Sequence, residues 1–259
     1  ATGNSTVNMD IRQQTHHRLL IVTAHPDDES FPIGGTIARY ASQGVDVTLL
    51  CATRGEKGIP NLEAAAAAAL REQELRKAAA ELGVSDIRFL DLIDGEVMQV
   101  GAGQVVSRLM VALQQIRPDA VITFGPDGIS GHPDHIAISH YTTQAFKLAL
   151  EKSALSPTAR LYYITPSEAT AQGCGVPPSS NLAGGPVAAI DVSDFLVTKV
   201  RAAQQHVSQH PPFGREPEAE AARLVCHEYF TLVHPTDFAG DILLEDLFVP
   251  LRASKFAPY

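Results

Sequence analysis

Short apolar runs alternate with amphipathic stretches along the chain up to residue 150. Four runs rich in branched aliphatic residues are predicted to be buried strands: residues 19–24, 45–53, 86–90 and 120–124. Four stretches place apolar residues at helical spacing: residues 34–43, 62–82, 104–116 and 135–150. Gly44 and Gly83 follow two of them, where helices commonly end. This alternation predicts an α/β fold with a doubly wound, mostly parallel sheet and helices on both faces.

The remainder of the chain is less regular. Its predicted elements are strands at 161–165, 187–192 and 227–233, and a helix at 193–208 with Ser193 as N-cap. Residues 166–186 are rich in Gly, Pro and Ser and predict a long surface loop, and the acidic segment 237–246 predicts a solvated loop. We expect a mobile polar segment at 1–16 and a single α/β domain over 17–259.

Composition narrows the class of protein only a little. The 259 residues are 45% hydrophobic and 19% charged, as in ordinary globular proteins, and the net charge of −9 argues against a nucleic-acid partner. No apolar run approaches the roughly 20 residues of a membrane span. Cys51, Cys174 and Cys226 are scattered, which favours reduced thiols and a cytoplasmic location. Gly34-Gly35 lacks a third glycine, so we expect no nucleotide cofactor.

Two polar motifs follow the first and fourth predicted strands. The first is His25-Pro26-Asp27-Asp28-Glu29, and the second is Gly131-His132-Pro133-Asp134-His135. Ligands of doubly wound sheets bind beyond the carboxyl ends of the strands, where the strand order reverses. In the common order 3-2-1-4, the first and fourth strands are neighbours, so the two motifs are expected to converge.

The residue types of the converging motifs suit a catalytic metal. A catalytic zinc takes three protein ligands and keeps one open position, and His25, Asp28 and His135 supply three. Asp27 is then left at the rim as general base. His132, one turn before His135, can stabilise an oxyanion or protonate a leaving amine.

Several of these residues also have a purely structural interpretation. A lone His-Pro-Asp is usually a turn, and only the pairing of the motifs favours a metal. Glu29 is predicted to bind backbone amides and orient its loop, and Asp134 to hold the imidazole of His132. Arg71 and Glu74 are spaced to form an exposed ion pair. His206 is predicted to pack near the site.

Together the motifs resemble the paired signatures of the PIG-L/LmbE family of zinc-dependent N-acetylglucosaminyl deacetylases. The resemblance extends to Thr53-Arg54-Gly55-Glu56, Arg71, Glu74, Asp94-Gly95, Lys199, Ala202, His206 and Ser208-Gln209. It implies a Rossmann-like fold, zinc bound by His25, Asp28 and His135, Asp27 as base, and His132 steered by Asp134. It also implies sugar contacts by Arg71 and Asp94.

The resemblance predicts hydrolysis of the N-acetyl amide of an N-acetylglucosamine-containing substrate. Two alternatives stay open, namely an amidase acting on thiol S-conjugates in the same site, and a protein that binds zinc and sugar without turnover. The same donors accept iron, cobalt or manganese. Relatives are often trimers or hexamers, so a homo-oligomer is expected. Some relatives carry Tyr where this chain has Ser130, which bears on rate and substrate preference.

Overall fold

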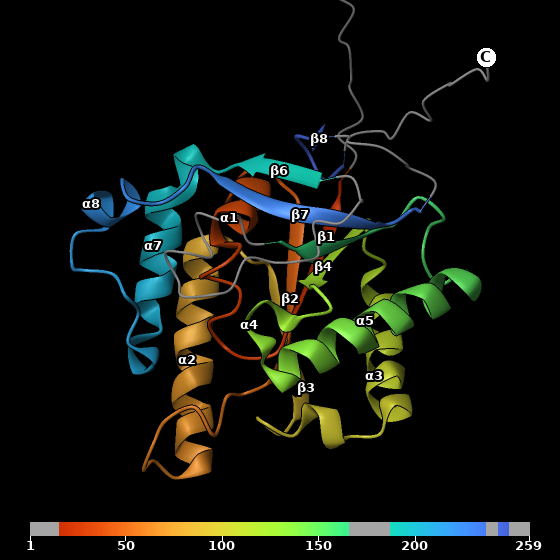
Figure 1. Ribbon diagram of the computed structural model, residues 1–259, viewed down its shortest axis with the longest axis horizontal. Coiled ribbons are helices and arrows are strands. Elements are labelled where there is room, and N and C mark those ends of the chain that lie inside the picture. Colours follow the sequence, from red (N-terminus) through yellow and green to blue (C-terminus); the bar gives the residue numbers. More distant parts are fainter. Residues whose placement is uncertain (1–15, 166–186, 237–242, 249–259) are drawn as a thin grey trace, which may run out of the picture.

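A computed structural model describes residues 16–165, 187–236 and 243–248. Within these residues one eight-stranded sheet crosses the molecule (Figure 1). The strands are β1 (Arg18–Thr23), β2 (Asp46–Thr53), β3 (Asp86–Leu92), β4 (Ala120–Phe124), β5 (Arg160–Ile164), β6 (Val187–Asp191), β7 (His227–His234) and β8 (Leu243–Leu244). The helices are α1 (Gly34–Ser42), α2 (Ala64–Leu82), α3 (Ala102–Ile116), α4 (Gly128–Gly131), α5 (Pro133–Glu151), α7 (Leu196–Gln205) and α8 (Pro217–Ala221), with short 3-10 turns η1 (Val97–Gln99), η2 (Ser193–Phe195) and η3 (Val207–Gln209).

The strand order of the sheet is β3-β2-β1-β4-β5-β7-β6-β8. Strands β1 to β5 run parallel to their neighbours in this order, whereas β7 pairs antiparallel with both β5 and β6. The predicted order 3-2-1-4 is therefore confirmed. Because the order of addition reverses between β1 and β4, the loops after these two strands border one crevice.

Helices cover both faces of the sheet. Helices α1, α2 and α7 contact one another on one face, and α3 packs with α5 on the other (Figure 1). Strand β1 lies between them and is buried from Leu19 to Thr23, as expected of a central parallel strand. None of the helices described is both long and apolar enough to cross a bilayer.

A carboxylate from β7 fixes the start of α1. Glu228 accepts hydrogen bonds from the backbone amides of Gly35 and Thr36 at 3.1 and 2.7 Å, and Lys199 of α7 donates to it at 2.6 Å. A negative charge is favourable at a helix N-terminus. A side chain at Gly35 would lie 2.6 Å from Val192, so only glycine allows this approach. The loop between β1 and α1 is thereby held at its far end.

The C-terminal part differs from the sequence-based prediction in two places. The helix predicted over 193–208 is divided into η2, α7 and η3. Ser193 does not cap it, because its hydroxyl donates to Asp191 Oδ1 at 2.5 Å instead. The predicted loop 237–246 contains β8, because Leu244 pairs beside β6 and is buried.

Several predictions fall on other parts of the chain. Residues 1–15, the predicted loop 166–186, and residues 237–242 lie outside the described residues. The single domain over 17–259 stays a prediction.

Candidate active site

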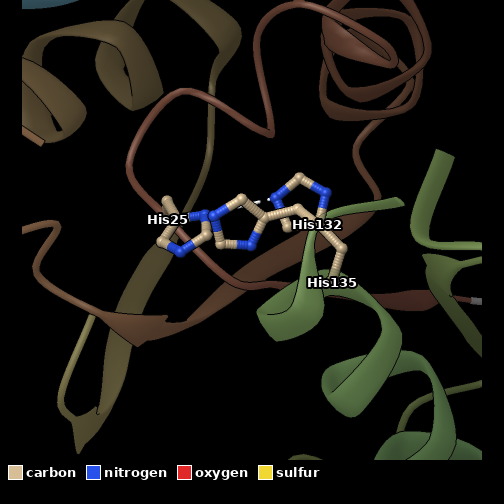
Figure 2. Close-up of side chains that lie close together, drawn as sticks. All are labelled: His25, His132 and His135. Atoms are coloured by element: carbon tan, nitrogen blue, oxygen red, sulfur yellow. Dashed lines mark hydrogen bonds between the residues drawn. The ribbon is translucent and has the colours of Figure 1, made fainter. Parts of the chain in front are cut away.

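The two sequence motifs meet at the crevice, where three imidazoles gather (Figure 2). The ring centroid of His25, in the loop after β1, lies 4.7 Å from that of His132 and 5.2 Å from that of His135. His132 is the N-cap residue of α5, and His135 lies in its first turn. The predicted convergence of the motifs is confirmed.

Nitrogen and oxygen atoms of His25, Asp28 and His135 lie close to one another. Nδ1 of His25 is 3.2 Å from Nε2 of His135, and Oδ1 of Asp28 is 3.3 Å from the same nitrogen. Oδ2 of Asp28 is 3.7 Å from Nδ1 of His25. Ligands of a tetrahedral zinc with bonds of about 2.0–2.2 Å lie roughly 3.3–3.6 Å apart. Two imidazole nitrogens this close need a proton or a cation between them, so these residues fit a divalent metal ion.

Two carboxylates contact the Nε2 side of the His25 imidazole, opposite the candidate ligand atom Nδ1. Its Nε2 lies 3.2 Å from Asp94 Oδ1 and 3.2 Å from Asp134 Oδ2. A proton on Nε2 leaves Nδ1 free as a ligand. Burial lowers the pKa of His25, but the hydrogen bonds to Asp134 and Asp94 and the charge of Asp28 outweigh it and raise the pKa to about 10. A metal at Nδ1 therefore displaces a proton.

The other candidate ligands are also held from behind. Nδ1 of His135 donates to the carbonyl oxygen of Gly128 at 3.0 Å, which leaves Nε2 free, and the ring stacks on Phe124 with centroids 4.1 Å apart. A Cβ atom at Gly128 would lie 2.9 Å from that of His135, so this approach requires glycine. Asp28 Oδ2 accepts from the backbone amide of His25 at 2.8 Å. The donor set is therefore preorganised.

Asp134 does not hold His132 as predicted. Its carboxylate contacts His25 and accepts amide hydrogen bonds from residues 95 and 97, while its backbone amide donates to Nδ1 of His132 at 3.2 Å. Asp134 thus fixes the tautomer of His132 through the main chain, with the ring proton on Nε2. Burial, and then the charges of His25 and His135, lower the pKa of His132. With Nδ1 accepting this hydrogen bond, the Nε2–H of the ring is left to donate.

Asp27 is the one residue of 19–30 that is not buried. Its φ of 127° is rare for a residue other than glycine and costs on the order of 1–3 kcal/mol. Partial loss of hydration of the carboxyl and the charge of Asp28 raise the pKa of Asp27 to about 7, while Arg71 acts in the opposite direction. Its location at the rim and a pKa near neutrality suit a general base.

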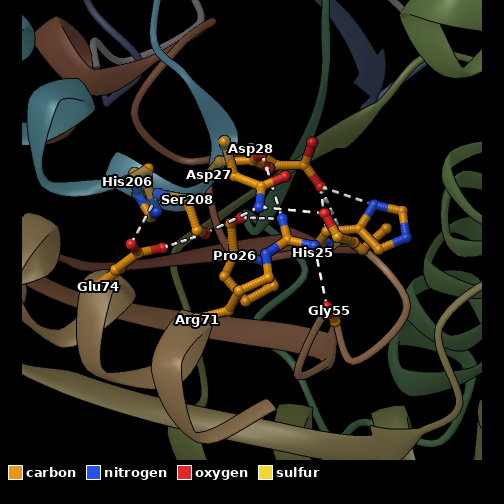
Figure 3. A network of polar contacts seen from close by, with 12 residues as sticks. His25, Pro26, Asp27, Asp28, Gly55, Arg71, Glu74, His206 and Ser208 are labelled. Atoms are coloured by element: carbon orange, nitrogen blue, oxygen red, sulfur yellow. Dashed lines mark hydrogen bonds and ion pairs between the residues drawn. The ribbon is translucent and has the colours of Figure 1, made fainter. Parts of the chain in front are cut away.

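Arg71 is only 3% exposed and lies behind Asp27 (Figure 3). Its guanidinium donates to the carbonyl oxygens of Pro26 at 2.6 Å and Gly55 at 3.2 Å, and lies 3.3 Å from Asp27 Oδ2. The predicted exposed ion pair between Arg71 and Glu74 is wrong. Both residues are buried, and each side chain turns to a tertiary partner. The sugar contacts of Arg71 and Asp94 stay predictions.

Glu29 and His206 form a buried pair that spacing alone did not indicate. Glu29 accepts the backbone amide of Asp27 at 3.0 Å, which confirms the prediction that it orients its loop. His206 is fully buried, as predicted, but its Nε2 also lies 2.7 Å from Glu29 Oε1. The sequence signal for this contact was the appearance of His206 in the family resemblance, which does not name its partner.

Comparisons with known proteins identify relatives of this chain. The PIG-L family, described as GlcNAc-PI de-N-acetylase, matches residues 20–146. The 1D-myo-inositol 2-acetamido-2-deoxy-alpha-D-glucopyranoside deacetylase of Kineococcus radiotolerans is 39% identical over 163 residues, which cover 51% of this chain and 45% of that enzyme. The enzyme of the same name from Actinosynnema mirum is 36% identical over 233 residues, which cover 74% of this chain and 80% of that enzyme.

A solved structure shares the fold. N,N'-diacetylchitobiose deacetylase from Pyrococcus horikoshii superimposes with a TM-score of 0.64 over 83% of each chain, at 22% identity. At this identity the comparison shows the architecture.

Proposed function

Because the chain belongs to the PIG-L family, we propose that it hydrolyses the N-acetyl amide of an N-acetylglucosamine-containing substrate. The products are acetate and a free amino sugar. The observation that carries the proposal is the cluster of metal-ligand donors from His25, Asp28 and His135 beside the partly exposed Asp27. The names of the relatives support the same reaction.

We propose zinc as the metal, with His25, Asp28 and His135 as its ligands. Two imidazoles and one carboxylate suit zinc and leave a position for water and substrate. Iron, cobalt or manganese can take the same donors. When bound, such an ion supplies Lewis acidity to the acetyl carbonyl and to the attacking water.

The chain's own side chains then manage the protons. Asp27 removes a proton from the water as the water oxygen bonds to the acetyl carbon. The Nε2–H of His132 donates a hydrogen bond to the carbonyl oxygen as that oxygen becomes negative. The proton on Asp27 passes to the amide nitrogen as the C–N bond breaks. Acetate and the amine leave, and Asp27 returns to its carboxylate form.

The first test is acetate release by chelated protein, before and after one equivalent of zinc. The panel is N-acetylglucosamine, N,N'-diacetylchitobiose, the inositol glycoside named for the relatives, and a thiol S-conjugate whose acyl group is joined by an amide to the amino sugar of that glycoside. Zinc-dependent acetate release from an N-acetylglucosamine compound is expected. A protein with one bound zinc that releases no acetate from any compound would overturn the proposal. Release of the free amine from the S-conjugate alone, without acetate, would establish the amidase alternative. Assembly into trimers or hexamers stays a prediction.

A further inference from the structure

We propose that His206 and Glu29 are a positioning pair that holds Asp27 in the conformation required of the base. The inference rests on the proposed function. Neither residue is a candidate metal ligand, and the hydrolysis described above uses neither of them. Their effect is transmitted through the backbone of the loop after β1.

The pair is buried completely, and both oxygens of the Glu29 carboxylate take part in hydrogen bonds. Glu29, Ser30 and His206 are each 0% exposed. Glu29 Oε1 lies 2.7 Å from His206 Nε2 and accepts from the hydroxyl of Ser30 at 2.5 Å. A buried ion pair is weak evidence for stability, because desolvation offsets its attraction. The second carboxylate oxygen, Oε2, is left for the loop.

That second oxygen grips the peptide unit between Pro26 and Asp27. Glu29 Oε2 accepts the N–H of this peptide from Asp27 at 3.0 Å, while Arg71 donates to its carbonyl oxygen, on Pro26, at 2.6 Å. The plane of this peptide sets φ of Asp27, which is 127°. A residue persists in so rare a conformation only where its surroundings hold it. Both ends of the peptide are held by buried charged side chains.

Helix α2 supports both contacts to this peptide, that of Arg71 and that of Glu29. Arg71 lies on α2 and reaches the peptide directly. Glu74, one turn later, accepts from the backbone amide and the hydroxyl of Ser208 at 2.8 and 2.6 Å (Figure 3). These bonds hold η3, and with it the neighbouring His206. The same helix therefore positions Asp27 through two independent routes.

Loss of the His206 contact has a specific expected effect. Glu29 Oε1 would lose the imidazole that holds it, and the carboxylate would be free to rotate away, which releases the amide of Asp27. A small misplacement of a catalytic group can cost about 100-fold in rate. Among the described residues, the polar partners of the His206 imidazole are Glu29 and Ser30 and not the candidate ligands, so metal binding is expected to survive.

A matched pair of variants isolates the hydrogen bond. In His206→Gln the side-chain amide nitrogen reaches the place of Nε2, whereas in His206→Asn it stops near Nδ1. In zinc-dependent acetate release, His206→Asn is expected to lower kcat by about 30- to 100-fold with KM within about twofold, and His206→Gln to stay within about threefold. Both are expected to bind one zinc. His227→Gln, at an exposed histidine of β7, is the control.

A double-mutant experiment tests whether His206 acts through Asp27. In the Asp27→Asn background, His206→Asn should cause no further loss of kcat, because the group that it positions has been removed. If His206→Asn does not fold, Ser208→Ala, which removes a hydroxyl bond to Glu74, takes its place with a smaller loss of kcat expected.

Three results would overturn the inference. These are equal kcat for the Gln and Asn variants, a full additional loss in the Asp27→Asn background, and a loss confined to KM or zinc content. A wild-type protein that binds zinc and releases no acetate would instead overturn the proposed function, and this inference with it.

Discussion

Asp27 and Asp28 are adjacent carboxylates with opposite surroundings. Asp28 is buried, and its oxygens face the nitrogens of His25 and His135. Asp27 faces Arg71 and remains partly exposed. Their environments favour separate roles, with Asp28 as ligand and Asp27 as base.

This separation predicts the behaviour of Asp27→Asn. The amide has the shape of the carboxylate but cannot take a proton from water, so kcat is expected to fall by about 10²- to 10⁴-fold. Zinc content measured on the same sample should stay at one equivalent. Turnover at the wild-type rate with zinc bound would show that another group is the base.

Asp134→Asn tests the carboxylate behind His25. The variant keeps one acceptor but loses the charge facing Nε2, so zinc affinity is expected to fall by about 10- to 100-fold. Competition with a chelator measures it. Asp86→Asn is the control, since its carboxylate pairs with Arg88 at the sheet edge. Equal affinities for both variants would remove Asp134 from the metal site.

At the residue scale, the sequence predicts the position of a side chain correctly where that position depends on the residue's own motif. The motifs and their order predict that His25, His132 and His135 lie beside one another, as they do. It could not show which neighbour the carboxylate of Asp134 faces, because that depends on the imidazole arriving from the loop after β1. Glu74 was assigned to Arg71 for the same reason, since its partner Ser208 lies far along the chain.

At the scale of elements, the turn after α7 carries a pH-dependent interaction. Burial lowers the pKa of His206, but the charge and hydrogen bond of Glu29 outweigh it, so the pKa is raised above 6.5. A raised pKa means that the stabilisation is fully present below about 6.5 and is lost as pH rises through the folded-state pKa.

The free energy of unfolding of wild type and His206→Gln should therefore differ more at pH 6 than at pH 9. Urea titrations at the two pH values measure this difference. A difference independent of pH would mean that His206 is neutral in the folded protein.

Helix α7 also offers two ion pairs in contrasting environments. Lys199–Glu228 is nearly buried at 2.6 Å, whereas Arg201–Glu218 is largely exposed at 3.0 Å. Glu228→Ala leaves the buried charge of Lys199 and two amides of α1 unpaired. The free energy of unfolding is therefore expected to fall by about 3–5 kcal/mol. Glu218→Ala should cost less than about 1 kcal/mol. Urea denaturation compares them, and equal costs would contradict this account.

The sequence predicted the strands β1 to β7, but it predicted neither the antiparallel pairing of β7 with β5 and β6 nor the strand β8. Strands β1 to β4 can be predicted because each is a short apolar run, and helices of regular length separate them. The two residues of β8 have no pattern of their own and gain strand structure from β6. Helix α7 ends before His206 because buried partners at Glu29 and Glu74 fix the backbone that follows.

At the scale of the whole molecule, a bound metal would join segments on both sides of the sheet's reversal point. An ion that binds only the folded protein adds about 2.7 kcal/mol of stability at 100 times its Kd. In a chain of this size, each kcal/mol of stabilisation raises Tm by about 2–4 °C. Zinc is therefore expected to raise Tm by roughly 5–10 °C over chelated protein. Calorimetry measures the shift. His135→Ala should abolish it, and an unchanged Tm in the wild type would argue against these ligands.

The order of parts along the chain has a consequence for biosynthesis. All three candidate ligands lie in the first 135 residues, whereas His206 and Ser208 emerge from the ribosome later. A nascent chain thus contains its candidate metal ligands before His206, which positions Asp27, has been synthesised. Metal capture and hydrolytic competence become separate events in time, and a fragment released early would hold the donors without a locked Asp27.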